Sequence, residues 1–293
     1  MNILVTIDDN YVTPLLVMIN SLFKNNKKVR ISIYVAYVSL SKKNKKAIHD
    51  LIVKEKGYCR FLLINEDKIA KFNTQGHITA TAYIRLFVSK ELPLNIHKIL
   101  YLDPDIIICG NIEKLYNKKI GSNCFAACPD IQGNRIEFPS RRDLGLSLNS
   151  IYFNTGVLLM NIDCLRSEDT WNELITYLSV EKKFRYHDQD IINDLYRNRI
   201  CPISCSYNYS SRRGDEFYDR VLPAAQKYCD KRKKYIIHYL GSKKPWKPHY
   251  DGRFAYRYLI DAIAVANISL LNVIIFNCFC NLFTFKWLQN EKK

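Results

Sequence analysis

The sequence contains few of the residues that mark linkers, and it is short of acidic side chains. Only 10 glycines and 9 prolines occur among 293 residues, and no internal repeat or Pro/Gly-rich linker is visible. The 10 cysteines form neither a close-spaced disulfide framework nor the two matched pairs of a zinc site, so we expect mostly buried, reduced thiols. With 44 basic and 28 acidic residues the net charge is +16, which favours polyanionic partners.

Two further absences narrow the class of protein. The N-terminus lacks the basic region and the long apolar core of a secretory signal peptide, so we expect a cytoplasmic catalytic part. No nucleic-acid-binding module is present, because the aromatic residues are scattered and no Cys/His spacing matches a zinc finger, so nucleic acid is not an expected partner. Apolar residues, in contrast, are abundant. They make up 48% of the sequence, which is enough for a sizeable core.

Strand-like and helix-like patterns alternate along the chain, which is typical of an α/β fold with a mostly parallel sheet flanked by helices. Expected strands are Asn2–Ile7, Arg30–Tyr37, Cys59–Ile64, Lys98–Leu102 and Ile151–Asn161, the last broken by Asn154-Thr155-Gly156. Expected helices are Val12–Lys24, Ser41–Lys56, Thr79–Val88, Thr170–Val180 and Asp188–Tyr196. Asp130–Ser150 is predicted to be a long loop, and Ser204–Lys234 shows no pattern that assigns an element.

The C-terminal part contains an uncharged run, Ala262–Phe285, long enough to cross a bilayer. Four asparagines interrupt it, and their buried amides would need partners in lipid. We therefore expect an apolar helical tail over 251–293 that lies on the membrane surface. A transmembrane span and a helix packed on the domain are the alternatives.

The aspartate pair Asp103 and Asp105 lies in an apolar run that reads as a strand buried on both faces. An isolated carboxylate there would be costly, so the pair requires a cation or strong hydrogen bonds, and a divalent metal is favoured. A turn cap at Asp103 is the structural alternative. An aspartate-nucleophile phosphatase is disfavoured, because Ile107 stands where such enzymes usually carry a small hydroxyl residue. Far downstream, the segment from His238 to Trp246 offers groups suited to a diphosphate.

Six motifs, in order, resemble those of the bacterial branch of glycosyltransferase family 8. They are Asp8-Asp9-Asn10-Tyr11, Thr81-Ala82-Tyr83-Ile84-Arg85-Leu86, Tyr101-Leu102-Asp103-Pro104-Asp105, Phe153-Asn154-Thr155-Gly156-Val157, His187-Asp188-Gln189-Asp190-Ile191-Ile192-Asn193 and His238-Tyr239-Leu240-Gly241-Ser242-Lys243-Lys244-Pro245-Trp246. The family's members are retaining enzymes with a Rossmann-like GT-A fold that move a hexose from a UDP-sugar with Mn²⁺. The resemblance implies the same fold and chemistry for residues 1–250, with 251–293 as the tail.

The resemblance also implies roles for individual residues. Asp103, Asp105 and His238 would hold Mn²⁺, or alternatively Mg²⁺, against the donor diphosphate, with further donors from Lys244 and the backbone at Gly241. Asp8, Asp9, Asn10 and Tyr11 would contact the uridine. Tyr83, Arg85, Asn154, Asp188 and Gln189 would contact the donor sugar or phosphate, with Gln189 beneath the anomeric carbon. It implies Gln189, Asp188 and Lys244 as the catalytic residues. The structural alternatives are turn formation for Asn154, helix capping for Asp188, and a salt-bridge partner or solvated charge for Lys244.

The function expected from these residues is transfer of galactose or glucose, with retention, from UDP-galactose or UDP-glucose. The expected acceptor is a glycan such as lipopolysaccharide core or lipid-linked oligosaccharide at the cytoplasmic face of the inner membrane. Because an amide is a poor nucleophile, a front-face route is favoured over a covalent intermediate on Gln189. The alternatives are a protein or initiator glucosyltransferase, a non-catalytic nucleotide-sugar-binding protein, and a sugar-phosphate hydrolase.

Overall fold

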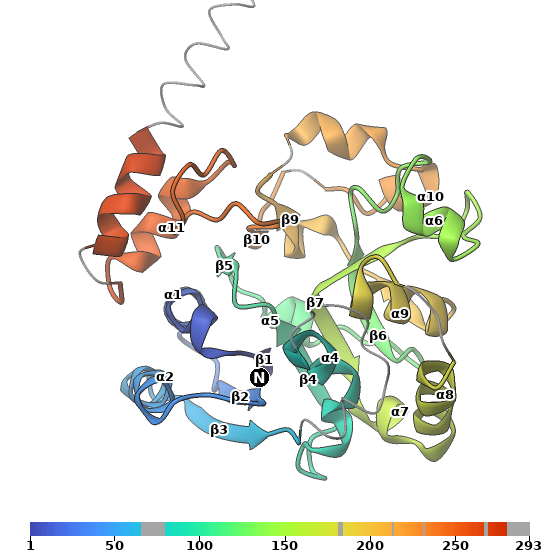
Figure 1. Ribbon diagram of the computed structural model, residues 1–293, viewed down its shortest axis with the longest axis horizontal. Helices are drawn as coiled ribbons and strands as arrows, with labels where there is room; N and C mark the ends of the chain where they lie inside the picture. Colours follow the sequence, from blue (N-terminus) through green and yellow to red (C-terminus); the bar gives the residue numbers. More distant parts are fainter. Residues whose placement is uncertain (66–79, 181–183, 213, 231, 267–268, 280–293) are drawn as a thin grey trace, which may run out of the picture.

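A computed structural model describes residues 1–65, 80–180, 184–212, 214–230, 232–266 and 269–279. Its centre is a seven-stranded sheet in the order β3-β2-β1-β4-β7-β6-β8 (Figure 1). The strands are β1 (Asn2–Thr6), β2 (Ser32–Tyr37), β3 (Tyr58–Leu63), β4 (Lys98–Leu102), β6 (Phe125–Pro129), β7 (Phe153–Asn161) and β8 (Ile200–Pro202). Neighbours pair in parallel except at β7, which runs antiparallel to both β4 and β6. The predicted α/β fold with a mostly parallel sheet is confirmed.

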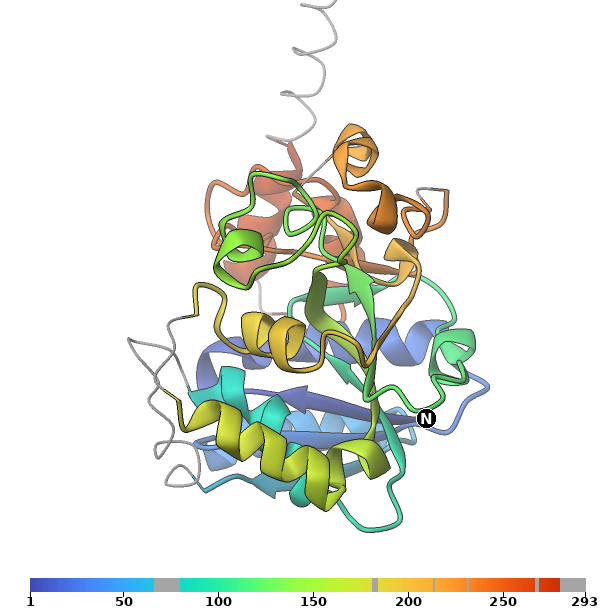
Figure 2. The same ribbon diagram turned by 90° about the vertical axis from the view of Figure 1, so that its right-hand side faces the viewer.

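Helices cover both faces of this sheet (Figures 1 and 2). On one face lie α1 (Val12–Asn25) and α2 (Lys42–Lys54), whose apolar residues pack against one core cluster with strand residues such as Ile3 and Val5. On the other face lie α4 (Ala80–Phe87), α7 (Ile162–Arg166), α8 (Glu168–Leu178) and α9 (His187–Leu195), around a second core cluster. Alternation along each strand sends successive side chains into these two cores, and this buries the central strands on both faces.

A second, three-stranded sheet stands at the end of the first, in the order β5-β10-β9. It consists of β5 (Ile106–Ile108), β10 (Ile236–His238) and β9 (Tyr209–Ser210), with β10 antiparallel to β5 and parallel to β9. The chain leaves the large sheet at Leu102 and enters the small one at Ile106. The aspartate pair therefore lies at the junction of the two sheets, beyond the carboxyl end of β4, where open α/β sheets bind ligands.

The other described elements before residue 255 are short connections. They are η1 (Asp9–Tyr11), η2 (Val88–Lys90), α5 (Glu113–Tyr116), α6 (Pro139–Asp143), η3 (Cys205–Tyr207), η4 (Asp215–Arg220) and α10 (Pro223–Gln226). The predicted loop Asp130–Ser150 thus contains one helix, α6, with Pro139 in its first turn, where the missing N–H of proline costs nothing.

Two predictions from the sequence are wrong. The polar triplet Asn154-Thr155-Gly156 does not break its strand, because β7 continues through it and its polar groups find partners within the site described below. Cys124 and Cys164 are not free thiols but form a disulfide that joins the start of β6 to α7. Their 40-residue separation hides this pair from an analysis of nearby cysteines.

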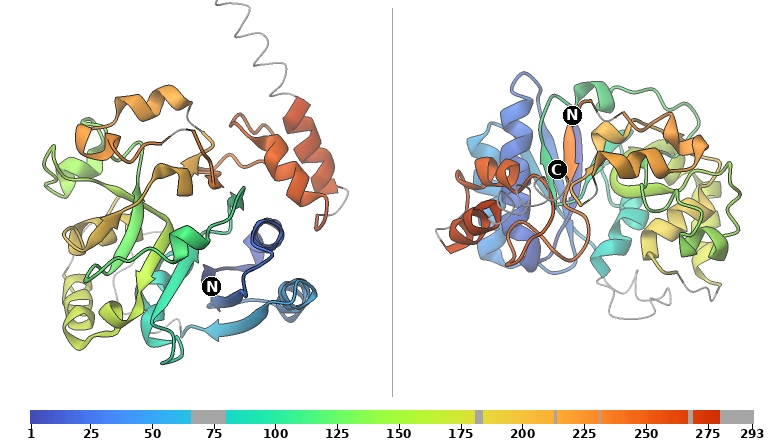
Figure 3. Two further views of the ribbon diagram at one scale, coloured as in Figure 1. Left: turned by 180° about the vertical axis from the view of Figure 1, so that it is seen from behind. Right: turned by 90° about the horizontal axis from the view of Figure 1, so that it is seen from above.

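The described C-terminal residues form α11 (Ala255–Ala262) and a helix over 269–279, on the same side of the molecule as α1 (Figure 3). They pack through Tyr258 and Ile274 onto a core cluster that includes Val17 of α1. The buried Asn277 amide donates to Pro245 O and Lys247 O, both at 2.9 Å. Within the described residues, no helix combines the length and apolarity needed to span a membrane. Residues 267–268 and 280–285 of the uncharged run lie outside the described part.

Candidate active site

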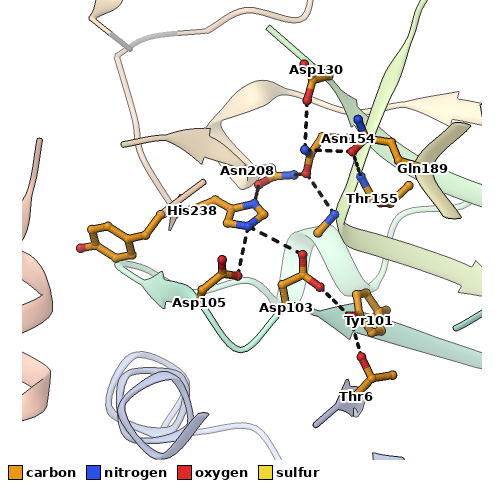
Figure 4. Close-up of polar contacts among 12 residues, drawn as sticks. Thr6, Tyr101, Asp103, Asp105, Asp130, Asn154, Thr155, Gln189, Asn208 and His238 are labelled. Atoms are coloured by element: carbon orange, nitrogen blue, oxygen red, sulfur yellow. Dashed lines mark hydrogen bonds and ion pairs between the residues drawn. The ribbon is translucent and has the colours of Figure 1, made fainter. Parts of the chain in front are cut away.

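Asp103, Asp105 and His238 converge at the junction of the two sheets (Figure 4). One ligand atom from each lies within 4.8 Å of the others. Nε2 of His238 is 3.1 Å from Asp105 Oδ1 and 3.7 Å from Asp103 Oδ2. His238 is buried at the end of β10, and Asp105 precedes β5, the antiparallel neighbour of β10. Strand pairing therefore brings together residues separated by more than a hundred positions.

The orientation of Asp103 is fixed from both sides. Its backbone N–H donates to Gly156 O at 2.8 Å, which continues the β4–β7 pairing past the end of β4. Its Oδ1 accepts from the hydroxyl of Tyr101 at 2.5 Å, and that hydroxyl in turn lies 3.0 Å from Thr6 Oγ1. The second oxygen, Oδ2, is the one that faces His238. Tyr101 thus leaves one carboxylate oxygen of Asp103 directed at the cluster.

Arg85 joins the aspartate pair to the α9 motif. Its Nη2 donates to Asp103 Oδ1 at 3.1 Å and its Nη1 to Thr155 O at 2.8 Å, while Nε lies 3.2 Å from Asp188 Oδ2 as an ion pair without hydrogen-bond alignment. Burial raises the pKa of Asp188, an effect that the Arg85 charge opposes. Burial would lower the pKa of Arg85, but Asp188 and Asp103 outweigh it and raise that pKa. Arg85 therefore stays charged and holds two sequence motifs together.

Lys244 is a buried cation paired with the other carboxylate. Its Nζ donates to Asp105 Oδ2 at 2.5 Å and to Tyr239 O at 2.6 Å. Burial alone would raise the pKa of Asp105, but Lys244 and His238 outweigh it and hold that pKa well below its ordinary value. Gly241 lies in the same segment with φ of 82°, a left-handed conformation that favours glycine.

Gln189 lies at the start of α9 with its carbonyl turned toward β7. Oε1 accepts from Thr155 N and from Asn154 Nδ2, both at 3.2 Å, and Nε2 donates to the Tyr152 hydroxyl at 3.3 Å. Asn154 is held in turn by Asp130 Oδ2 at 3.0 Å. Asn154 and Thr155 of β7 thus hold the side-chain amide of Gln189 in place.

The residues of the first-strand motif separate into two groups. Tyr11 packs edge-on against Trp246 at 6.2 Å between ring centroids, so the first and last motifs meet. Asp8 accepts from Asn10 N at 2.9 Å and caps η1. Asp9 points elsewhere: its carboxylate accepts from Ser41 N at 3.0 Å and from Asn44 Nδ2 at 2.7 Å, at the start of α2. The structure does not bring the Asp9 carboxylate to the cluster.

Other predicted and unpredicted residues complete the site. Tyr83 is buried near Asp188, which adds to the effect of burial in raising the pKa of Tyr83. Sequence reasoning missed Asn208, whose Oδ1 lies 2.8 Å from His238 Nδ1. It also assigned no role to Asp130, Tyr152 or Thr155, although Thr155 stands inside a motif that the sequence analysis quoted. Proximity to a motif could have suggested Thr155, but no local pattern marks Asn208.

The cluster fits a divalent cation of intermediate hardness. Two carboxylates and one imidazole provide oxygen and nitrogen ligands, a set that suits Mn²⁺ and tolerates Mg²⁺. Neighbouring cations at Arg85 and Lys244 provide the positive surroundings that a diphosphate requires. The residues present therefore fit the metal and the anionic ligand that the motifs imply.

Comparison with known proteins supports this interpretation. The family described as Glycosyl transferase family 8 matches residues 2–249. The chain is 26% identical over 250 residues to a lipopolysaccharide 1,2-glucosyltransferase of Escherichia coli, covering 82% of this chain and 71% of that one. It is 25% identical over 275 residues to general stress protein A of Bacillus subtilis, covering 87% and 92%.

A solved structure agrees with these sequence matches. The galactosyltransferase LgtC, crystallised with donor and acceptor sugar analogs, superposes with a TM-score of 0.79 at 26% identity, covering 92% of this chain and 97% of that one. The match confirms the GT-A fold and the resemblance stated from the sequence. The chain is a glycosyltransferase that belongs to glycosyl transferase family 8.

Proposed function

We propose that the protein transfers glucose or galactose from a UDP-sugar, with retention, to a glycan acceptor in a Mn²⁺-dependent reaction. The observation that carries this proposal is the convergence of Asp103, Asp105 and His238 beside two buried cations, Arg85 and Lys244. The carboxylates and imidazole would hold the metal. When bound, the metal would neutralise the charge that develops on the departing nucleoside diphosphate.

The donor site is built from the first and last motifs. Tyr11 and Trp246 offer aromatic surface for the uracil base, and Asp8 and Asn10 lie at the same end of β1. Lys244 and the backbone around Gly241 supply donors for the diphosphate. Lys244 is buried and paired with Asp105, so water would screen its charge only weakly from a phosphate oxygen close to it.

A front-face reaction accounts best for retention in this site. Gln189 Oε1 accepts hydrogen bonds from Thr155 N and Asn154 Nδ2, so its lone pairs point into the protein. Gln189 therefore positions the sugar rather than attacking its anomeric carbon. The leaving phosphate oxygen can take the proton of the acceptor hydroxyl as the new glycosidic bond forms, so the protein supplies alignment and electrostatic stabilisation.

Two arguments favour an acceptor at the inner membrane. A similar protein of Escherichia coli is a lipopolysaccharide glucosyltransferase, so lipopolysaccharide core or a lipid-linked oligosaccharide is the first acceptor to test. Exposed apolar side chains also occur on α11 and the helix over 269–279, including Ile260, Phe276 and Phe279. Together with the net charge of +16, they suit peripheral binding to an anionic leaflet. The division at residue 250 into catalytic part and tail stays a prediction.

The test is a donor and acceptor screen with the full chain. UDP release is measured with UDP-glucose or UDP-galactose, with or without Mn²⁺, against lipopolysaccharide core, lipid-linked oligosaccharide and a protein acceptor. Asp105→Asn serves as the matched control, because it removes one charge with almost no change in shape. Metal-dependent UDP release and an α-linked product from the α-linked donor support the proposal. Binding without UDP production, or phosphate release from sugar phosphates, would contradict it.

A further inference from the structure

We propose that Asn208 is a positioning residue that fixes the tautomer of His238 and presents the Nε2 lone pair to the metal site. The inference rests on the proposed metal role of His238 and extends it to a residue outside every recognised motif. Asn208 lies between η3 and β9, in the stretch Ser204–Lys234 that shows no sequence pattern.

The assignment starts from a group whose role is unambiguous, the backbone N–H of Gly156, which can only donate. It donates to Asn154 Oδ1 at 3.0 Å, so this atom is the amide oxygen. The same oxygen lies 2.7 Å from the side-chain amide of Asn208, which must therefore present Nδ2 to it. Its other atom, Oδ1, then faces His238 (Figure 4).

In this network Nδ1 of His238 has one consistent role, that of a donor, whatever the charge of the ring. Nδ1 lies 2.8 Å from Asn208 Oδ1, an acceptor, so Nδ1 carries the proton. In a neutral imidazole the lone pair is then on Nε2, the ring atom that faces Asp105 Oδ1 and Asp103 Oδ2. A metal-binding histidine depends on such a partner for its orientation and basicity.

Strand pairing explains why residue 208 occupies this position. In the parallel β9–β10 pair, Tyr209 aligns with Ile237 and Ser210 with His238. Residue 208 therefore precedes His238 by two places in the register, and side chains two places apart share a face. Asn208 and His238 are both buried, so no bulk water replaces the amide if it is removed.

The network also continues toward the reacting sugar. Asn154, which receives the Asn208 bond, donates to Gln189 Oε1. Asn208 thus has two separable contacts. Its oxygen orients His238, and its nitrogen donates to Asn154, which in turn holds Gln189. A variant that keeps one contact and loses the other distinguishes this role from simple packing.

The experiment compares Asn208→Ala and Asn208→Asp in the full chain. Mn²⁺ affinity without nucleotide is measured by electron paramagnetic resonance, with kcat for transfer in parallel. Asn208→Ala should weaken Mn²⁺ binding by about 10- to 100-fold, because both contacts are lost. Asn208→Asp keeps the acceptor for Nδ1–H, so its Mn²⁺ affinity should stay within about threefold of wild type or rise, while its kcat falls. Asn26→Ala, at a buried amide that bonds Leu22 O and Ile112 N, controls for stability loss alone.

Nitrogen NMR of the metal-free wild-type protein gives an independent readout. We expect His238 to be protonated at Nδ1 when neutral. An Nε2–H tautomer, or a folded Asn208→Ala protein with wild-type Mn²⁺ affinity, would overturn the role of Asn208. Failure of wild type itself to bind Mn²⁺ would instead overturn the proposed metal site, whatever the tautomer.

Discussion

Gly156 lies so close to the imidazole ring of His238 that no side chain fits between them. A Cβ at Gly156 would lie 2.2 Å from His238 Cε1, and also 2.7 Å from Asp103 Oδ2. No side chain fits there without moving a proposed ligand. The glycine of the Asn-Thr-Gly triplet is therefore required by the imidazole that packs on β7.

Gly156→Ala should displace the imidazole and weaken Mn²⁺ binding at least about tenfold, with a stability loss of about 1–3 kcal/mol from overpacking. The measurements are a Mn²⁺ titration and thermal unfolding. Gly121→Ala is the control: its Cβ would meet no atom of the described residues within 4 Å, but the φ of 57° makes a side chain strained. It should cost about 1 kcal/mol and leave Mn²⁺ affinity unchanged. Wild-type metal affinity in Gly156→Ala would show that the site tolerates a shifted ring.

Gln189→Ala should slow transfer more than it weakens donor binding. The amide is expected to align the sugar, so kcat should fall by about 10²-fold while donor affinity changes by less than about threefold. UDP release gives kcat, and calorimetry gives the dissociation constant of the UDP-sugar. If binding were lost as completely as transfer, Gln189 would be a donor-binding residue and its position beneath the anomeric carbon would need revision.

Asp9→Ala should destabilise the protein in a pH-dependent way. Hydrogen bonds from Ser41 N and Asn44 hold the pKa of Asp9 below its ordinary value of 3.8, so the folded state favours the carboxylate. The stability it contributes is present above pH 3.8 and disappears as the pH falls through the lower, folded-state pKa. Melting temperatures of variant and wild type should differ at pH 7 and converge in acid. A weakened UDP affinity in Asp9→Ala would instead support the uridine contact expected from the sequence.

Asn277→Ala should loosen the segment that follows Lys244. Removing the amide leaves the buried carbonyl of Pro245 and the partly buried carbonyl of Lys247 without their donor and should cost about 1–3 kcal/mol. Asn272→Ala, at an exposed asparagine of the same helix, should change stability by less than about 0.5 kcal/mol. Urea unfolding of the two variants tests the difference. Equal stabilities would mean that the helix over 269–279 does not hold this segment.

The sequence predicts those helices and strands that a pattern among neighbouring residues encodes. Alternation of apolar strands and capped helices places β1, β2, β3 and β4 within two residues of their observed ends, because apolar runs of strand length leave a clear pattern. Burial on both faces strengthens this pattern in β1, β2 and β4, while β3 is a largely exposed edge strand. Asp103 and His238 can also be singled out from the sequence, because each lies within a local motif. Their convergence follows from the pairing of β5 with β10, which no local pattern encodes.

What the sequence misses depends on long-range contacts. Asn208 acquires its position only when β9 pairs with β10, and the Cys124–Cys164 disulfide only when α7 packs beside β6. The triplet of β7 looks like a strand break, because isolated polar residues and glycine disfavour a buried strand. In the folded protein Asn208 and Gly156 N satisfy Asn154, and the imidazole fills the space beside the glycine.

The most direct test of the central claim is anomalous diffraction from crystals soaked with Mn²⁺ and UDP. We expect one manganese peak within bonding distance of Asp103, Asp105 and His238, with the diphosphate beside Lys244 and the uracil near Tyr11. The peak should vanish in Asp105→Asn crystals soaked in the same way. Manganese at another site, or UDP bound away from these side chains, would contradict the account.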